Sequence, residues 1–331
     1  NILNAISIYI LGSESPQGAI NAAWGVLISA FMYFCFQFYM CLPNLKEYTF
    51  KLYLSHPILK KIIKISIPAL LLSASAHINF IISKSFTTNF PSGSISALEM
   101  SNKIWNLPLG IFAQGLSTVI LPTLSAQNAL NNIENFKQTL IKALKYVFLI
   151  SIPACVGFMV FASPITKVIY EWSKPLQPST LSNIINLLFF YGIALIVYSS
   201  QTITRTVFFS TGQSKIPMFL GLLAILLNFG INSILFKIFN INHLSISVIA
   251  MSFSISGLII AILQLLIIHK KYNILTFDLY LFILKLIISA CIMAGFIYFF
   301  NMLWPEIYTS KMYHIAQTLI KISLAAIIYF T

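Results

Sequence analysis

The sequence has 331 residues, of which 58% are hydrophobic and only 8% are charged. A soluble globular protein carries about 25% charged residues, so this composition excludes a water-soluble fold, and its hydrophobicity also excludes a disordered chain. The net charge of +13 is typical of a membrane protein that follows the positive-inside rule, and we prefer this interpretation to nucleic-acid binding.

Long apolar segments follow one another along the chain, with lengths near the roughly 20 residues that span a bilayer as a helix. Barrel strands would instead alternate apolar and polar residues. We therefore predict an all-α polytopic membrane protein with about ten transmembrane helices. The segments are 1–11, 20–42, 62–83, 95–121, 144–163, 181–204, 217–237, 245–268, 279–300 and 312–330. The first is too short to span, and we expect it to be the end of a helix that begins before residue 1.

The basic residues of the connections divide unequally between the two sides of the predicted bundle. Those on one side are Lys46, Lys51, Lys60, Lys61, Lys64, Lys137, Lys142, Lys145, Arg205, Lys215, Lys270 and Lys271. Those on the other side are Lys84, Lys167, Lys174, Lys237 and Lys311. By the positive-inside rule the first side is cytoplasmic, and the C-terminus lies on that side.

Residues 126–144 do not have the composition of a plain loop. Asn, Glu and Lys separate apolar side chains that recur at helical spacing, namely Leu130, Ile133, Phe136, Leu140 and Leu144. This pattern predicts an amphipathic helix that lies on the cytoplasmic membrane surface.

The segment 95–121 carries a polar stripe along one side of the predicted helix. At 100° per residue, six positions fall within about 80° of arc, and they are Glu99, Lys103, Asn106, Gly110, Gln114 and Ser117. A charge at the centre of a bilayer costs about 2.5–3.5 kcal/mol, so it faces a cavity or a partner. We expect the stripe to line a water-filled cavity. Alternatively, Glu99 and Lys103 neutralise each other as an i,i+4 pair and the stripe joins neighbouring helices.

A second polar face occurs in and just beyond the segment 62–83. Its members are Ser66, Ser73, His77 and Lys84. We expect this face to line the same cavity, although a single histidine in a membrane helix more often bonds a neighbouring helix than relays protons.

Two further segments carry polar side chains. Gln201 and Arg205 share a face near the end of 181–204, with Tyr198 one turn earlier. Asn228 and Asn232 lie one turn apart in 217–237, and we interpret them as packing residues.

The sequence contains none of the common catalytic or metal-binding motifs, such as HExxH, GxSxG, Walker A or GxGxxG. Its seven carboxylates are scattered, and its four cysteines form no CxxC pair. We therefore expect neither an enzyme nor a metal site or cofactor, and a coupling ion is not readable from these residues. Lys and amide side chains instead favour a path for an anion, and diphosphate is a suitable match.

Three runs of residues resemble one family of membrane transporters. The runs are Ser94–Leu98, Asn102–Phe112 and Leu116–Ser125. They resemble the Ser-Val-Ser-Ala-Leu, Asp-Arg-Leu-x-x-Leu-Pro-Leu-Gly and Thr-Val-Leu-Leu-Pro-Thr-Leu-Ser patterns of the MurJ (MviN) lipid II flippases. The turn 208–217 is similar to that family's Phe-Tyr-Ala-Arg-Gly-Asp-Thr-Arg-Thr-Pro, and Asn228 and Asn232 match family asparagines.

The resemblance implies a fourteen-helix flippase or exporter fold, in which two six-helix lobes face a central cavity and two helices follow. By that layout, residues 1–43 are the last helices of the N-terminal lobe and 44–61 are a cytoplasmic linker. Residues 62–270 are then a complete six-helix C-terminal lobe, and 277–331 are the additional helix pair, which in the family helps to form a groove for the lipid tail. The first four helices of the family lie outside this sequence.

The resemblance also implies a function. A flippase of this family moves undecaprenyl-diphosphate-linked peptidoglycan precursor (lipid II) from the inner to the outer leaflet of the bacterial cytoplasmic membrane by alternating access. Its partners would be this lipid, membrane lipids and other cell-wall synthesis proteins, with no nucleic acid. The expected substrate-binding residues are Lys103, Asn106, Gln114, Glu99, His77, Lys84 and Arg205.

Three positions depart from the family pattern. Lys103 stands where the family has a cavity arginine, Asn102 stands where it often has Asp, and Ser83 lies near another frequent Asp. The alternative function is a related exporter of other polyprenyl-linked glycans or of drugs, and a third is a membrane-embedded enzyme or scaffold.

Overall fold

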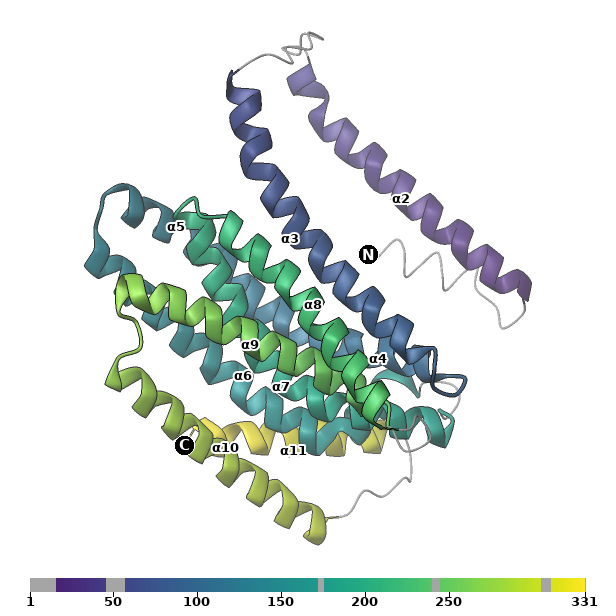
Figure 1. Ribbon diagram of the computed structural model, residues 1–331. Helices are drawn as coiled ribbons and strands as arrows, with labels where there is room; N and C mark the ends of the chain where they lie inside the picture. Colours follow the sequence, from purple (N-terminus) through teal and green to yellow (C-terminus); the bar gives the residue numbers. More distant parts are fainter. Residues whose placement is uncertain (1–15, 46–56, 172–175, 240–244, 305–310, 331) are drawn as a thin grey trace. The chain divides into compact units, whose positions relative to one another are not determined.

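The computed structural model describes residues 16–45, 57–171, 176–239, 245–304 and 311–330 (Figure 1). Every regular element in these ranges is helical. The elements are α2 (Pro16–Leu45), α3 (Pro57–Thr87), α4 (Ser94–Pro108), the π-helix η1 (Leu109–Gln114), α5 (Gly115–Ala129), α6 (Ile133–Tyr170), α7 (Pro178–Ser210), α8 (Lys215–Ile238), α9 (Ser247–Tyr272), α10 (Phe277–Leu303) and α11 (Lys311–Phe330).

Eight helical segments within the described ranges are long and apolar enough to cross a membrane. They are Ile20–Pro43, Ser66–Thr87, Ser94–Ala129, Ile133–Tyr170, Pro178–Ser210, Lys215–Ile238, Ser247–Tyr272 and Phe277–Leu303, and α11 holds a shorter apolar stretch, Ile315–Tyr329. The prediction of an all-α polytopic membrane protein is confirmed. The predicted segment 1–11 and most of the predicted linker 44–61 lie outside the described residues.

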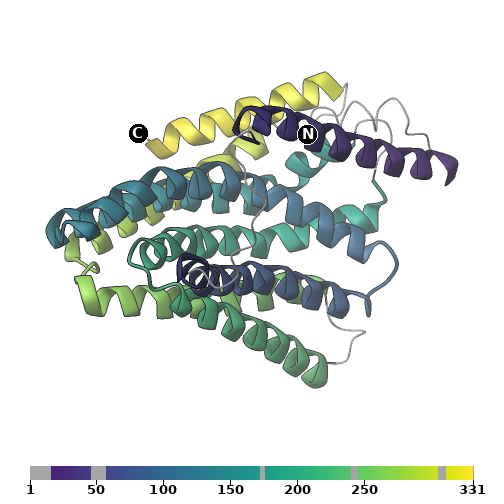
Figure 2. The same cartoon turned by 90° about the horizontal axis from the view of Figure 1, so that it is seen from above.

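The chain divides into two compact units, residues 1–60 and 61–331. The described part of the first unit is α2 and the beginning of α3. In the second unit the helices form a layered bundle with roughly aligned axes (Figure 2).

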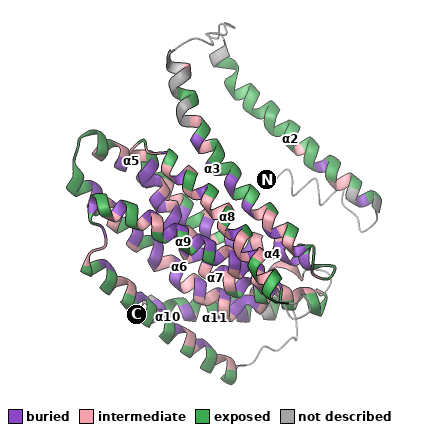
Figure 3. Cartoon of the chain, viewed as in Figure 1, coloured by how far each residue is buried: buried purple, intermediate pink, exposed green. Residues whose placement is uncertain are grey.

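Helix α7 is the centre of the second unit, where it packs on α4, α5, α6 and α9. Buried residues are concentrated on α6, α7 and α9 (Figure 3). Gly192 permits the close approach of α6 and α7, because a Cβ at this position would lie 2.9 Å from the carbonyl oxygen of Cys155. The residues of this unit therefore form a continuous apolar core around α7.

The prediction of a separate surface helix at 126–144 is wrong, because these residues belong to two longer helices, α5 and α6. Residues up to Ala129 end α5, and a turn follows with Asn131 in the left-handed region (φ 52°). Helix α6 then runs from Ile133 to Tyr170, with a kink at Phe161. Asn132 caps α6, because its side chain accepts a hydrogen bond from the backbone N–H of Asn135 at 3.2 Å. Such a cap satisfies a backbone donor that the first helical turn leaves free.

Three of the five apolar residues of this stretch face the bundle, whereas Leu130 and Ile133 are exposed. Phe136, Leu140 and Leu144 are buried, and Phe136 stacks on Tyr272 of α9 with ring centroids 4.8 Å apart. A helical hydrophobic period identifies an amphipathic helix but not what its apolar face packs against, which is why the sequence pattern was misread.

The predicted helix 95–121 is continuous from Ser94 to Ala129, but six residues at its centre form the π-helix η1. Pro108 directly precedes η1 and has no N–H for the i→i−4 hydrogen bond of an α-helix. Gly110 and Gly115 lie within and just after η1, and glycine weakens the preference for α-helical geometry. Single π-helical turns within α-helices often occur at functional sites.

Helices α10 and α11 pack against each other and against α6. Lys321 lies deep in α11 and donates hydrogen bonds to Asn301 Oδ1 at 2.7 Å and to the Trp304 carbonyl at 2.9 Å. Its ammonium thus binds carbonyl groups at the C-terminal end of α10, where a positive charge is favourable.

Candidate functional site

A polar cavity of about 300 Å³ lies among α3, α4, η1, α7, α8 and α9 of the second unit. Aromatic and aliphatic side chains form part of its wall, including Phe80, Trp105 and Phe253. Its polar lining consists of Ser75, His77, Asn79, Asn102, Asn106, Gln114, Tyr198, Gln201, Thr202, Arg205 and Gln264. An interior so rich in hydrogen-bonding groups at membrane depth is suited to water or a polar ligand.

The α4 wall is organised around Asn102. Its Oδ1 accepts hydrogen bonds from Trp105 Nε1 and from Asn106 Nδ2, both at 2.9 Å. The indole of Trp105 stacks on Tyr191 with centroids 5.5 Å apart. The amides are therefore held in place by an aromatic cluster. Asn106 and Gln114, two members of the polar stripe predicted on this helix, reach the cavity.

Another member of the stripe joins helices instead. Ser117 of α5 shares a hydrogen bond of 2.6 Å with Thr206 of α7. The stripe therefore serves both purposes considered for it, with amides at the cavity and a hydroxyl between two helices.

The α7 wall contributes the cation of the cavity. Arg205 donates from Nη2 to Gln201 Oε1 at 2.6 Å, and Gln201 in turn donates to the Gly257 carbonyl at 2.8 Å. The Nε atom of Arg205 is buried and has no hydrogen-bond partner. No carboxylate of the described residues forms an ion pair with this guanidinium. A half-buried guanidinium with an unused donor is an arrangement that an anion stabilises.

Gln264 of α9 belongs to the same wall. It is buried and accepts a hydrogen bond from Thr204 Oγ1 at 2.6 Å. Gln264 was not among the predicted site residues. The signal for it was the single amide side chain of the predicted span 245–268, because such an amide in a membrane helix requires a polar partner.

Three of the predicted site residues lie outside the lining of the cavity. Lys84 of α3 forms an ion pair with Glu99 of α4, and its ammonium also lies 5.2 Å from the ring centroid of Phe80. The i,i+4 pairing of Glu99 with Lys103 is therefore wrong. Lys103 is exposed, and no hydrogen bond or ion pair joins it to another residue that the structure describes.

Asparagines join α3 to α8 beside the cavity. Asn228 donates to the side chain of Asn79 and, at 3.3 Å, to Ser83 Oγ. Asn232 donates to Asn228 Oδ1 at 2.9 Å. All four side chains are buried. The interpretation of Asn228 and Asn232 as packing residues is confirmed, and Asn79 extends the network to the cavity wall.

Comparison with known proteins identifies relatives of this chain. The family model described as lipid II flippase MurJ matches residues 1–318, which confirms the resemblance carried by residues 94–125. A probable lipid II flippase MurJ of Rickettsia prowazekii is 25% identical over 232 residues, which are 70% of this chain and 45% of that protein. The chain spans about half the length of the curated relatives it matches.

Solved structures share the fold. A lipid II flippase MurJ in an inward closed conformation matches with a TM-score of 0.74 and 24% identity, over 99% of this chain and 64% of that one. An outward-facing multidrug resistance MATE family transporter of the MOP superfamily matches with a TM-score of 0.62 and 20% identity, over 82% of this chain and 59% of that one. At these identities the likeness shows the helical architecture alone.

Proposed function

Because the chain belongs to the lipid II flippase MurJ family, we propose that it forms the second lobe and the last helix pair of a flippase for undecaprenyl-diphosphate-linked peptidoglycan precursor. The transported headgroup is large, polar and anionic, whereas the hydrocarbon core is about 30 Å thick. A protein cavity that opens alternately to the two sides removes the need to expose the headgroup to lipid. The polar cavity of the second unit supports this proposal.

Arg205 is the residue on which the chemistry of the proposal depends. Its planar guanidinium can bind two oxygens of a diphosphate at once, and its buried Nε still has a free N–H. Asn106, Gln114 and His77 line the same cavity and would offer hydrogen bonds to the remaining oxygens or to the sugars. We propose Lys103 as a second cation for the headgroup, since it is exposed on α4.

We assign a different role to Lys84 and Glu99. Their ion pair connects α3 to α4, so each charge already has its partner. In this proposal the two residues join the end of α3 to the beginning of α4 and do not contact the substrate.

We further infer that the protein lies in the bacterial cytoplasmic membrane with its C-terminus in the cytoplasm. The excess of basic residues in alternate connections supports this orientation. The function needs neither catalysis nor a cofactor, and the membrane potential, at about 2.3 kcal/mol per charge per 100 mV, is a sufficient source of energy for moving an anionic headgroup outward.

Complementation tests the role of Arg205. The full-length gene is expressed in cells depleted of their own flippase, and growth and cell lysis are followed. Arg205→Ala should fail to rescue. Arg205→Lys should rescue weakly, because the ammonium keeps the positive charge but cannot bind two oxygens at once as a guanidinium does. Lys215→Ala, a change at an exposed cation outside the cavity, should rescue normally. Normal rescue by Arg205→Ala at equal membrane abundance would contradict the assignment.

A related exporter of drugs or other polyprenyl-linked glycans is the second candidate, because MATE transporters share the fold. An exporter of cationic drugs needs acidic residues in its cavity, and none of the described lining residues is Asp or Glu. This observation favours an anionic substrate. Accumulation of a lipid-linked glycan other than the peptidoglycan precursor on depletion would instead favour the exporter.

A further inference from the structure

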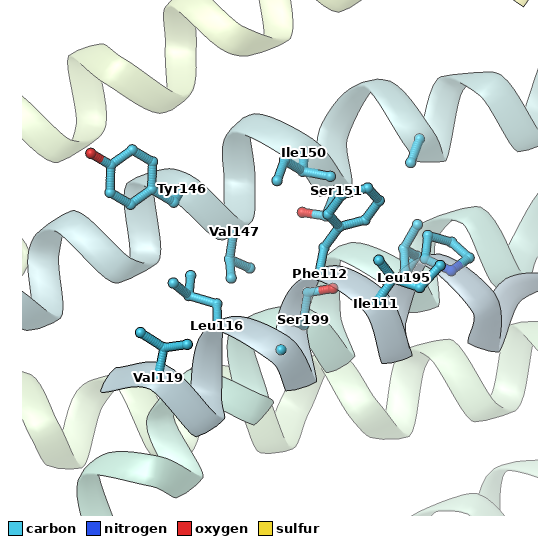
Figure 4. Close-up of a pocket in the computed structure, with 14 residues that line it drawn as sticks. Ile111, Phe112, Leu116, Val119, Tyr146, Val147, Ile150, Ser151, Leu195 and Ser199 are labelled. Carbon is cyan, nitrogen blue, oxygen red and sulfur yellow. The ribbon is translucent and has the colours of Figure 1, made fainter. Parts of the chain in front are cut away.

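A second cavity, of about 340 Å³, lies between η1, α5, α6 and α7 (Figure 4). Its wall is almost entirely apolar and includes Ile111, Phe112, Leu116, Val147 and Ile150. Two serines, Ser151 and Ser199, are the polar side chains that Figure 4 shows deep in this wall. We refer to it below as the apolar pocket.

The π-helix separates the apolar pocket from the polar cavity. Gln114 of η1 lines the polar cavity, whereas Ile111, Phe112 and Ala113 of the same helix line the apolar pocket. The two hollows therefore have opposite chemistry on the two sides of one six-residue element. A ligand of the apolar pocket is distinct from the polar ligand proposed above.

The apolar pocket is open at the surface of membrane-spanning helices. Ile111, Val119 and Tyr146, which form its rim, are 66%, 71% and 56% exposed. Water is a poor occupant because it needs two to four polar partners, and the wall offers mainly carbon. The medium around the middle of such helices is hydrocarbon, so a flexible hydrocarbon chain is the occupant that fits this wall.

One end of the pocket carries groups suited to a phosphate. Tyr146 lies at that end (Figure 4), and amphipathic aromatic side chains prefer the boundary between hydrocarbon and headgroups. Lys142 is exposed and lies one turn earlier on the same face of α6. Lys145, by contrast, is directed to the ring of Phe282, with its ammonium 5.3 Å from the centroid. Lys142 forms no ion pair with a described residue and thus offers a positive charge where a headgroup would lie.

We propose that the apolar pocket binds an acyl chain of an anionic phospholipid, with the headgroup phosphate at Lys142 and Tyr146. Phospholipid is the solvent of these helices, so even a weak site is filled by mass action. The proposal depends on the membrane location of α5, α6 and α7 and not on flippase activity.

Photo-crosslinking in vesicles tests this site directly. The full-length protein is reconstituted into phosphatidylethanolamine vesicles that contain phosphatidylglycerol with a photoreactive diazirine in one acyl chain, and labelled peptides are identified by mass spectrometry. Labelling should be concentrated on the α6 peptide that contains Ile150 and Ala154, above the level on the lipid-facing side of α10.

Variants separate a specific site from general lipid contact. Ala154→Phe places a ring in the pocket and should remove the concentrated labelling, whereas Ala294→Phe, the same change at an equally half-buried position of α10, should leave it. Leu116→Trp fills the pocket from α5 and gives an independent readout if Ala154→Phe does not reach the membrane. Lys142→Gln should lower labelling by phosphatidylglycerol about fivefold, the effect of losing one basic residue near an anionic surface, and Lys270→Gln should not.

Three results would overturn the proposal. The first is uniform labelling of all lipid-facing helices. The second is concentrated labelling that both filling variants leave unchanged. The third is labelling of the pocket by a photoreactive polyprenyl phosphate or by cross-links from the protein's own N-terminal segments, in place of phosphatidylglycerol.

Discussion

The Lys84 ammonium of α3 and the Glu99 carboxylate of α4 form an ion pair across the turn that joins these helices. The pair neutralises two charges near one edge of the bundle and leaves Lys103, one turn beyond Glu99, with its charge uncompensated by any described residue. Of the three cationic side chains predicted to bind substrate, Lys103 on the surface of α4 and Arg205 in the cavity wall therefore remain for a ligand.

Removing the ion pair should lower stability only slightly. Lys84 and Glu99 are 36% and 43% exposed, and such exposed pairs contribute at most about 1 kcal/mol because water and salt screen them. A double-mutant cycle of Lys84→Gln and Glu99→Gln, read by thermal unfolding of the full-length protein in detergent, should give a favourable coupling that shrinks as salt is raised. A coupling of zero at low salt would show that the contact does not persist in solution.

Transport should tolerate the substitution Lys103→Arg but not Lys103→Glu. If this exposed cation contacts an anionic headgroup, Lys103→Arg keeps the charge, Lys103→Gln loses it and Lys103→Glu repels the ligand. Complementation should follow that order at equal membrane abundance. Lys237→Glu, a charge reversal at an exposed position at the end of α8, is the matched control. Full rescue by Lys103→Glu would remove Lys103 from the transport path.

Gly257→Ala should destabilise the cavity wall. A Cβ at Gly257 would lie 2.8 Å from Cε2 of Tyr198, so the tyrosine ring or α9 must move. Overpacking of this kind costs about 1–3 kcal/mol. Gly230→Ala is the matched control, because no heavy atom lies within 4 Å of its added Cβ, and helix propensity alone should make that variant neutral or slightly more stable. Equal melting temperatures for the two variants would contradict the close approach.

Asn228→Leu should weaken the junction of α3 and α8. The substitution removes the amide group that donates hydrogen bonds to Asn79 and Ser83. Their buried acceptor atoms lose these hydrogen bonds, which lowers the free energy of unfolding by about 1–3 kcal/mol. The melting temperature of the full-length protein should fall. Asn128→Leu, at an exposed position of α5, should not lower it. An unchanged melting temperature for Asn228→Leu would show that the network contributes little.

Hydropathy and helical periodicity were sufficient to predict eight membrane-length helices of the described residues and the polar residues Asn106 and Gln114 of the cavity. These properties are local, because an apolar run of sufficient length spans the bilayer whatever its neighbours are. The family resemblance also depended on short runs of residues, namely those between residues 94 and 125 and the turn 208–217.

Contacts between helices were decided by the tertiary structure. The partner of Glu99 is Lys84 on another helix rather than Lys103 on its own helix. Phe136, Leu140 and Leu144, which were predicted to lie on a membrane surface, pack into the bundle. Likewise, the contribution of Gln264 to the cavity and the bonding of Lys321 to the end of α10 depend on which helices are neighbours. The rotation and depth of each helix determine such pairs, and both follow from how all the side chains of the bundle fit together rather than from the periodicity of any one segment.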